Sequence, residues 1–175
     1  MKLSIIICSY NRASYIEAAF HSLYNQSSGL DSFETIIVDN NSTDNTADVF
    51  KQWRASHANG SFTYLTESKQ GASFARNTGA ANAKGQWLCF MDDDAIANIN
   101  YVENILVHIE TKPNTVGFGG RIIPKYIPAE PKWMSYYVSS LVGNFDYAPA
   151  ACAFEHGKYP LESNMIVRKD VYDVI

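Results

Sequence analysis

The chain has 175 residues, of which 46% are hydrophobic and 18% are charged, and its formal net charge is −4. A chain of this length buries roughly 70% of its unfolded surface, which is enough for one globular domain with a substantial core. The acidic balance lacks the basic stripe that nucleic acid selects, and no stretch approaches the roughly 20 apolar residues of a membrane helix. We therefore expect neither a nucleic-acid partner nor a transmembrane segment.

Strand and helix patterns alternate along the first two thirds of the chain. Leu3 to Cys8 is a continuous apolar run, typical of a strand buried on both faces of a parallel sheet. Ser14 and Glu17 have the spacing of a capping box that opens an amphipathic helix. The same patterns predict strands at 35–38, 62–65, 87–91 and 116–123, and helices around 49–53, over 72–83 and around 102–109. This alternation predicts an α/β, Rossmann-like fold with a mostly parallel central sheet flanked by helices.

The alternation ends at Pro124. Residues 124–160 are rich in Pro, Tyr and Ala without a clean period, which is typical of a long lid or binding loop. Its aromatic side chains can form stacking platforms for a ligand, cover the sheet, form a subunit interface or belong to a surface left bare by a missing continuation. They are Tyr126, Trp133, Tyr136, Tyr137, Phe145 and Tyr147.

Three cysteines lie far apart, at positions 8, 89 and 152, without metal-ligand spacing. This pattern favours reduced thiols and predicts a cytoplasmic location. The apolar run at the start of the chain is too short for a secretory signal. Any association with a membrane would depend on something outside this chain.

Three carboxylates, Asp92, Asp93 and Asp94, directly follow the apolar strand at 87–91. They repel one another and lose hydration beside that strand, so a bound cation would stabilise them. Hard oxygen ligands select Mg²⁺ or Mn²⁺. The alternative is a solvated acidic turn that caps the next helix.

Polar residues also end the first two predicted strands, at 8–12 and at Asp39. Ligands of an open parallel sheet bind beyond the carboxyl ends of its strands, so these residues are candidates for one site. Tyr10 suits stacking on a base or a place on the rim, and Asp39 suits either a base N–H or a turn. Arg76, in a helix of small residues, is either a diphosphate partner or a surface residue. The absence of G-x-G-x-x-G and Walker motifs argues against a dinucleotide oxidoreductase or an NTPase.

Four segments carry a resemblance to a known family. They read "SIIICSYNR", "ETIIVDNNSTDNTADVF", "GASFARNTGAANAKGQWLCFMDDD" and, more loosely, "ESNMIVRKDVYDVI". Together they resemble the family 2 glycosyltransferases with the GT-A fold, over essentially the whole chain. The resemblance implies inverting transfer of a sugar from a nucleotide-sugar donor, most often a UDP-sugar, with Mn²⁺ or Mg²⁺. The acceptor would be a glycan or a lipid-linked sugar.

The resemblance also implies roles for individual residues. Nucleotide contacts fall on Cys8, Ser9, Tyr10, Arg12, Asp39, Arg76, Asp92 and Asp93, and metal ligation on Asp94 and Asp92. Tyr10 would stack on the base and Asp39 would hydrogen-bond it. Arg76 would hold the base or the phosphates, and Asp94 would be the principal metal ligand.

The resemblance implies one structural domain with two parts. Residues 1–123 would bind the nucleotide-sugar, and residues 124–175 would begin the acceptor-side region. Relatives place an acidic catalytic base after the "NM-x-x-R" segment, so we expect this base beyond Ile175, with Glu162 as a weak substitute. We therefore expect a truncated chain that binds the donor but does not transfer the sugar efficiently. The alternatives are a non-catalytic binding module and a sugar-phosphate nucleotidyltransferase. The nucleotidyltransferase is disfavoured because no glycine follows the first strand.

Overall fold

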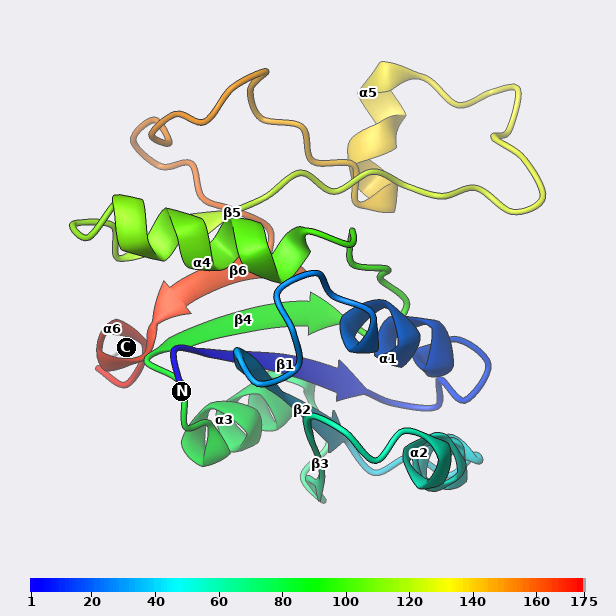
Figure 1. Cartoon of the computed structure of the whole chain (residues 1–175). Coiled ribbons are helices and arrows are strands. Elements are labelled where there is room, and N and C mark those ends of the chain that lie inside the picture. Colours follow the sequence, from blue (N-terminus) through cyan, green and yellow to red (C-terminus); the bar gives the residue numbers. More distant parts are fainter. Residues whose placement is uncertain (175) are drawn as a thin grey trace.

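A computed structural model describes residues 1–174, without the side chain of Tyr136. In this part of the chain six strands form one sheet in the order β3-β2-β1-β4-β6-β5 (Figure 1). They are β1 (Leu3–Ser9), β2 (Phe33–Asp39), β3 (Ser61–Thr66), β4 (Trp87–Asp92), β5 (Gly117–Gly119) and β6 (Asn164–Arg168). The pairs β1–β2, β2–β3 and β1–β4 are parallel, whereas β6 runs antiparallel to both β4 and β5. The predicted α/β fold with a mostly parallel sheet is confirmed.

Helices cover both faces of the sheet. They are α1 (Ile16–Tyr24), α2 (Thr46–Ser56), α3 (Ala72–Asn82), α4 (Tyr101–Thr111), α5 (Tyr136–Ser139), the 3-10 turn η1 (Ser140–Val142) and α6 (Lys169–Tyr172). The apolar residues of α1, α2 and α4 pack with one face of the sheet, and those of α3 and α6 pack with the other. None of the described helices has the length and apolar character needed to cross a membrane.

Strand β1 explains why a continuous apolar run is needed at the centre of the sheet. Successive side chains of a strand point to opposite faces. Ile5 and Ile7 accordingly join the core under α1, α2 and α4, while Ile6 joins the core under α3. All three are at most 1% exposed. The centre of the sheet is therefore a rigid base for the residues at its carboxyl edge.

Helix α3 approaches the sheet closely through Gly79. A Cβ atom built there would lie 2.5 Å from Ile6 Cγ2 and 3.3 Å from Val38 Cγ2. Only a residue without a side chain fits at this distance. The small residues of this helix therefore set its height above β1 and β2.

The predicted capping box at Ser14 and Glu17 does not form. Helix α1 has Tyr15 as its N-cap, without a capping hydrogen bond from a side chain. The backbone N–H groups of Tyr15 and Ile16 instead donate to the Arg12 carbonyl, at 2.9 and 3.1 Å. Glu17 lies 3.6 Å from His21, one turn along the helix. Contacts of the preceding loop, described below, thus determine where the helix begins.

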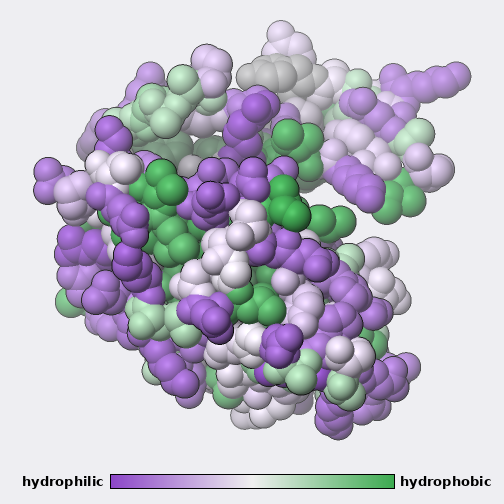
Figure 2. Space-filling model, in the orientation of Figure 1, coloured by the Kyte–Doolittle hydropathy of each residue, from purple (hydrophilic) through white to green (hydrophobic). Residues whose placement is uncertain are grey.

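The strand predicted at 116–123 is shorter than expected. Strand β5 covers only Gly117–Gly119, and Ile122 then forms an isolated bridge with Phe145. Glycines inside a strand weaken it because they add backbone entropy and no packing. Residues 124–160 are mostly irregular, as predicted, and form the arm at the top of Figure 1. Hydrophilic residues dominate the face in Figure 2, with hydrophobic residues in small groups between them.

Candidate active site at the strand ends

The order of the strands reverses at β1, which pairs with β2 on one side and with β4 on the other. Such a switch point leaves a crevice at the carboxyl ends of the two flanking strands. The register places Ser9 beside Asp39, and Cys8 beside Asp92. Residues that are far apart in the sequence therefore meet at one edge of the sheet, as expected.

A cavity of about 300 Å³ lies at this edge. It is lined by Ile6, Cys8, Tyr10, Arg12, Ala72, Arg76, Phe90, Met91, Asp92, Asp93 and Glu162. Most of the predicted nucleotide-binding residues are in this lining. Ser9, Asp39 and Asp94 are not.

The loop after β1 is held by the loop before α2. Asn11 has a positive φ of 54°, and its Oδ1 accepts hydrogen bonds from the backbone N–H groups of Thr43 (2.8 Å) and Asp44 (3.3 Å). The backbone N–H of Arg12 donates to Thr46 Oγ1 at 3.2 Å. These bonds fix the backbone on either side of Arg12 and leave Tyr10 47% exposed at the cavity. Asn and Asp tolerate this left-handed conformation better than most residues, which is the signal that would have identified Asn11.

The three aspartates lie in different environments. Asp93 is 8% exposed, whereas Asp92 and Asp94 are exposed residues. Burial raises the pKa of the Asp93 carboxyl, and Arg12 opposes this with its Nε 3.7 Å from Asp93 Oδ1. Partial burial of the Asp92 carboxyl against the strand end also raises its pKa, and neighbouring Asp94 adds to the effect. The cluster therefore combines one buried and two exposed carboxylates with a guanidinium beside the buried one.

Cys8 and Ser9 end β1 beneath this cluster. Burial raises the pKa of the Cys8 thiol to about 12, so the thiol is neutral. Ser9 is 2% exposed, and its hydroxyl lowers the pKa of Asp93. No hydrogen bond of ordinary geometry satisfies the Ser9 Oγ within the described chain. Buried hydroxyls are normally paired, so this one is a polar group without a full partner at the site.

Asp39 is 6% exposed and lies one strand away from the cavity. Its Oδ1 accepts a hydrogen bond from the Ser42 backbone N–H at 2.9 Å, and its Oδ2 accepts one from the Tyr64 hydroxyl at 2.6 Å. Burial and this bond raise the pKa of Tyr64. Each carboxylate oxygen has a second lone pair, so Asp39 retains the capacity to accept a further hydrogen bond.

Asn40 organises the entry to α3, a role that the sequence reading missed. Its Nδ2 donates to the carbonyls of Glu67 (3.0 Å) and Lys69 (2.8 Å), and its Oδ1 accepts from the Gly71 N–H at 2.7 Å. The residue is 4% exposed. One side chain thus ties β2 to the start of the helix that carries Arg76. An Asn directly after a buried strand was the signal of this role, and it also fits a turn.

Arg76 points from α3 toward Glu162, which lies on the segment before β6. Arg76 Nη1 is 2.9 Å from Glu162 Oε2, and the two side chains are 23% and 68% exposed. Arg76 also lowers the pKa of Asp92. Positive charge from α3 therefore faces the acidic end of β4 across the cavity.

The described residues contain no group of three or more His, Cys, Asp or Glu side chains placed to hold a metal ion by themselves. Mg²⁺ is commonly held by one or two carboxylates together with substrate phosphates. Asp92 and Asp94 offer oxygen donors of this kind beside a cationic Arg76. The donor chemistry fits a hard cation shared with a phosphate-bearing ligand.

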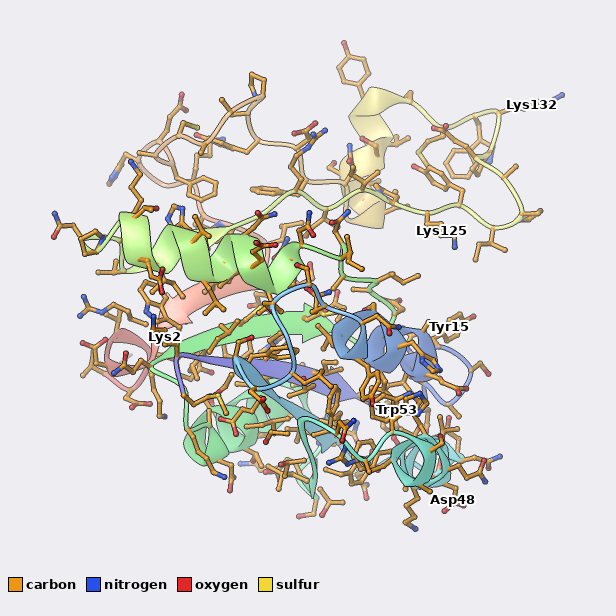
Figure 3. The ribbon with its side chains drawn as sticks, in the orientation of Figure 1. Lys2, Tyr15, Asp48, Trp53, Lys125 and Lys132 are labelled. Carbon is orange, nitrogen blue, oxygen red and sulfur yellow. The ribbon has the colours of Figure 1, made fainter. Side chains whose placement is uncertain are left out.

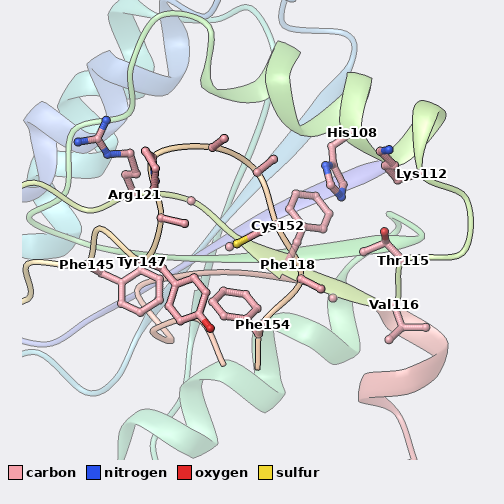
Figure 4. Close-up of a pocket in the computed structure, with 18 of the residues that line it drawn as sticks. His108, Lys112, Thr115, Val116, Phe118, Arg121, Phe145, Tyr147, Cys152 and Phe154 are labelled. Atoms are coloured by element: carbon pink, nitrogen blue, oxygen red, sulfur yellow. The ribbon is translucent and has the colours of Figure 1, made fainter. Parts of the chain in front are cut away.

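A larger hollow of about 820 Å³ lies beside β5, and its lining shares no residue with the cavity at the strand ends (Figure 4). Phe145, Tyr147 and Phe154 form a ring cluster on one side of it, with the Tyr147 and Phe154 centroids 4.7 Å apart. Among the other predicted aromatic residues, Trp133 and Tyr137 are 73% and 89% exposed. The predicted Tyr136 platform lies outside the described side chains. The hollow is larger than the strand-end cavity, but it lacks that cavity's cluster of carboxylates.

Comparison with known proteins places this geometry in a family. The chain is 40% identical over 112 residues to an uncharacterized glycosyltransferase of Haemophilus influenzae, which covers 64% of this chain and 36% of that protein. It is 39% identical over 92 residues to a putative teichuronic acid biosynthesis glycosyltransferase of Bacillus subtilis, covering 53% of this chain and 35% of that protein. The chain thus spans about a third of the length of these two relatives.

Solved structures of glycosyltransferases are also similar to this chain. A mannosyltransferase from Pyrobaculum calidifontis in complex with GDP-Man and Mn²⁺ has a TM-score of 0.64 at 26% identity, covering 67% of this chain and 34% of that chain. S. aureus TarS 1-349 in complex with UDP-GlcNAc has a TM-score of 0.62 at 25% identity, covering 71% of this chain and 37% of that chain. The model of the Glycosyl transferase family 2 matches residues 4–174. The chain therefore belongs to the family 2 glycosyltransferases and has their GT-A fold.

Proposed function

We propose that the strand-end cavity binds a nucleotide-sugar donor, most simply a UDP-sugar, together with Mn²⁺ or Mg²⁺, and that the sugar is transferred to a glycan or lipid-linked acceptor with inversion. The observation that carries the proposal is the meeting of Arg76 and the acidic end of β4 around a cavity at the switch point of the sheet. The similar structures named above contain UDP-GlcNAc, or GDP-Man with Mn²⁺.

The nucleoside would lie against the end of β1. Tyr10 offers an exposed ring for stacking on the base, and the backbone of Cys8 and Ser9 offers hydrogen-bonding groups beside it. Asp39 would accept a hydrogen bond from a base N–H with its remaining lone pairs. Asp92 or Asp93 would reach the ribose. These assignments follow the resemblance to the family, and Ser9 and Asp39 lie outside the cavity lining.

The diphosphate would lie between Arg76 and the metal. Asp94 would be the principal metal ligand, with Asp92 beside it, and Arg12 adds a second positive charge next to Asp93. When bound, the metal stabilises the negative charge that develops on the departing diphosphate. Arg76 would contribute to the same stabilisation, because a guanidinium donates two parallel N–H groups to phosphate oxygens.

Transfer would proceed by one in-line displacement. The acceptor hydroxyl attacks the anomeric carbon from the face opposite the diphosphate, the bond to the diphosphate breaks, and the configuration inverts. A carboxylate on the acceptor side takes the hydroxyl proton. A base beyond Ile175 lies outside the described residues and stays a prediction. Glu162, the weaker candidate, lies at the cavity but is paired with Arg76.

The acceptor would approach from the side of residues 124–160. The ring cluster beside β5 offers flat apolar faces that suit pyranose rings. The side chain of Lys132 projects away from the rest of the chain on this arm (Figure 3). A lipid-linked acceptor would bring this arm to the cytoplasmic face of a membrane.

Removal of the Arg76 charge tests the proposal. Arg76→Ala should weaken binding of UDP or GDP in the presence of Mn²⁺ by about 10- to 100-fold, because a hydrogen bond to a charged group contributes about 1.5–3 kcal/mol. Lys51→Ala is the matched control, since Lys51 is a surface cation on α2 that is 74% exposed. Equal nucleotide affinity of Arg76→Ala and Lys51→Ala would argue against the proposed donor site.

A further inference from the structure

Glu162 and Arg76 form an ion pair between two parts of the chain that border the donor cavity. Arg76 belongs to α3, and Glu162 lies two residues before β6. Both residues line the cavity, and their side-chain charges are 2.9 Å apart. The pair is thus placed where the proposed donor would put its diphosphate.

The surroundings of Glu162 are unfavourable for a carboxylate apart from Arg76. Asp92 borders the same cavity, and the negative charge of Glu162 contributes to the raised pKa of Asp92. Glu162 is 68% exposed, whereas Arg76 is 23% exposed. The guanidinium is therefore the more enclosed partner, and the carboxylate is the partner that can leave.

The backbone next to Glu162 is anchored independently of this ion pair. The Asn164 N–H donates to the Leu161 carbonyl at 3.0 Å, closing a turn around Glu162. Asn164 Oδ1 accepts a hydrogen bond from the Tyr101 hydroxyl at 2.6 Å, and Asn164 is 8% exposed. The Glu162 side chain can rotate into solvent without unfolding this turn.

We propose that, in the donor-free chain, Glu162 pairs with Arg76 at the position that the donor diphosphate takes when it binds. Glu162 therefore competes with the diphosphate for Arg76 and lowers the affinity of the chain for the donor. This inference rests on the proposed donor site. A carboxylate and a phosphate present similar oxygen pairs to a guanidinium. On donor binding the diphosphate replaces the carboxylate, and repulsion from the diphosphate turns Glu162 outward. Glu162 is thus an affinity-determining residue and not a donor ligand.

Charge-neutral substitution at residue 162 tests this role. Glu162→Gln keeps the size of the side chain and removes its charge. It should bind UDP or GDP with Mn²⁺ about two- to five-fold more tightly than the wild type by calorimetric titration, which is the size expected for an exposed ion pair that must be broken. Glu155→Gln is the matched control, because it removes the same charge from the same segment at a residue outside the cavity lining. Its affinity should equal that of the wild type.

A double-mutant cycle separates competition for Arg76 from general charge repulsion. In the Arg76→Ala background, Glu162→Gln should lose most of its gain, since the contested cation is absent. A full gain in that background, an unchanged affinity or a weaker affinity of the single variant would each overturn the inference while leaving the donor site intact. Failure of the folded wild type to bind any nucleotide would overturn the donor site and this inference together.

Discussion

Ser9 and Ser4 lie on the same strand and differ in how their hydroxyls are satisfied. Ser4 Oγ donates to Glu34 Oε1 at 2.6 Å and accepts from the Gly85 N–H at 2.8 Å. Ser9 Oγ lacks a partner of ordinary geometry in the described chain. Both residues are at most 2% exposed. The first hydroxyl belongs to a closed structural network, whereas the second lies buried at the end of β1 with hydrogen-bonding capacity left over.

Substitution of the two serines by alanine should have opposite effects on stability. Ser4→Ala should lower the free energy of unfolding by about 1–3 kcal/mol, because it leaves the buried Gly85 N–H without its acceptor and removes one hydrogen bond to Glu34 Oε1, which keeps the one from the Lys84 N–H. Ser9→Ala should leave the free energy of unfolding unchanged or raise it by up to about 1 kcal/mol. Urea denaturation of the three proteins measures both values. A loss of stability in Ser9→Ala equal to that in Ser4→Ala would show that the Ser9 hydroxyl is fully bonded.

The sequence allowed most residues of the cavity to be predicted, because strand ends of a parallel sheet converge. Cys8 and Asp92 were found in this way, whereas Arg76 was chosen as a possible diphosphate partner in a helix of small residues, and all three line the cavity. Asn40 was missed because its hydrogen-bond partners lie 27 to 31 residues away in the sequence. The pairing of Glu162 with Arg76 was not predictable either, since it depends on how the irregular segment returns to the sheet.

At the scale of single elements, α3 links the packing of the sheet to the site. Gly79 lies against Ile6, and Arg76 lies three residues earlier on the same helix. Any change in the height of the helix at Gly79 therefore moves the guanidinium relative to the end of β4. The entry of the helix is fixed by Asn40, and side chains farther along it hydrogen-bond to Glu67 and Tyr172.

Gly79→Ala should destabilise the chain and weaken nucleotide binding together. The added methyl group would lie 2.5 Å from Ile6 Cγ2, and overpacking of this kind costs about 1–3 kcal/mol. Ser73→Ala, at an exposed position of the same helix, should change the free energy of unfolding by no more than about 0.5 kcal/mol. Chemical denaturation gives the free energy of unfolding of both variants, and calorimetric titration gives their nucleotide affinity. Wild-type stability of Gly79→Ala would show that α3 can move away from the sheet freely.

The loop between β2 and α2 supports the site through Asp44. Asp44 Oδ1 accepts a hydrogen bond from Thr46 Oγ1 at 2.5 Å, and Asp44 Oδ2 accepts one from the Ala13 N–H at 3.1 Å. The Thr46 hydroxyl is the largest cause of the lowered pKa of Asp44. A carboxylate whose pKa is lowered by folding stabilises the fold at pH values above its ordinary pKa of 3.8. This stabilisation is lost as the pH falls through the lowered pKa.

Asp44→Asn should therefore make the free energy of unfolding depend less on pH in the acidic range. The variant should be less stable than the wild type near neutral pH, and the difference should shrink as the pH falls below 3.8. Denaturation at a series of pH values measures this difference. A difference that stays constant across the series would mean that Asp44 acts by shape and not by charge.

The elements themselves were predictable to different degrees. The buried strands and amphipathic helices of the first two thirds were predicted, because their apolar period is strong. The capping box failed because the loop contacts of Asn11 and Thr46 decide where α1 begins. Strand β5 was predicted too long, since its apolar residues suggested a strand while Gly117 and Gly119 weaken one. The antiparallel direction of β6 has no local signature in the sequence.

For the molecule as a whole, charges of both signs meet at the carboxyl edge of the sheet. The chain carries a formal net charge of −4, yet Arg12 and Arg76 both face the aspartates at the end of β4. This edge offers both the oxygen ligands for a cation and the guanidinium groups for a diphosphate. The proposed division into a donor part at 1–123 and an acceptor-side part from 124 stays a prediction, and the cavity lining draws on both parts, since it includes Glu162.

The most direct test of the account is calorimetric titration of UDP and GDP, each with and without Mn²⁺, on the wild type, Asp94→Ala and Asp31→Ala. Asp31 is an exposed aspartate outside the cavity lining, so its variant controls for the loss of one negative charge. The account predicts manganese-dependent binding of at least one nucleotide, retained in Asp31→Ala and lost in Asp94→Ala. Equal binding with and without Mn²⁺, or equal binding by the two variants, would contradict a metal-assisted donor site at the end of β4.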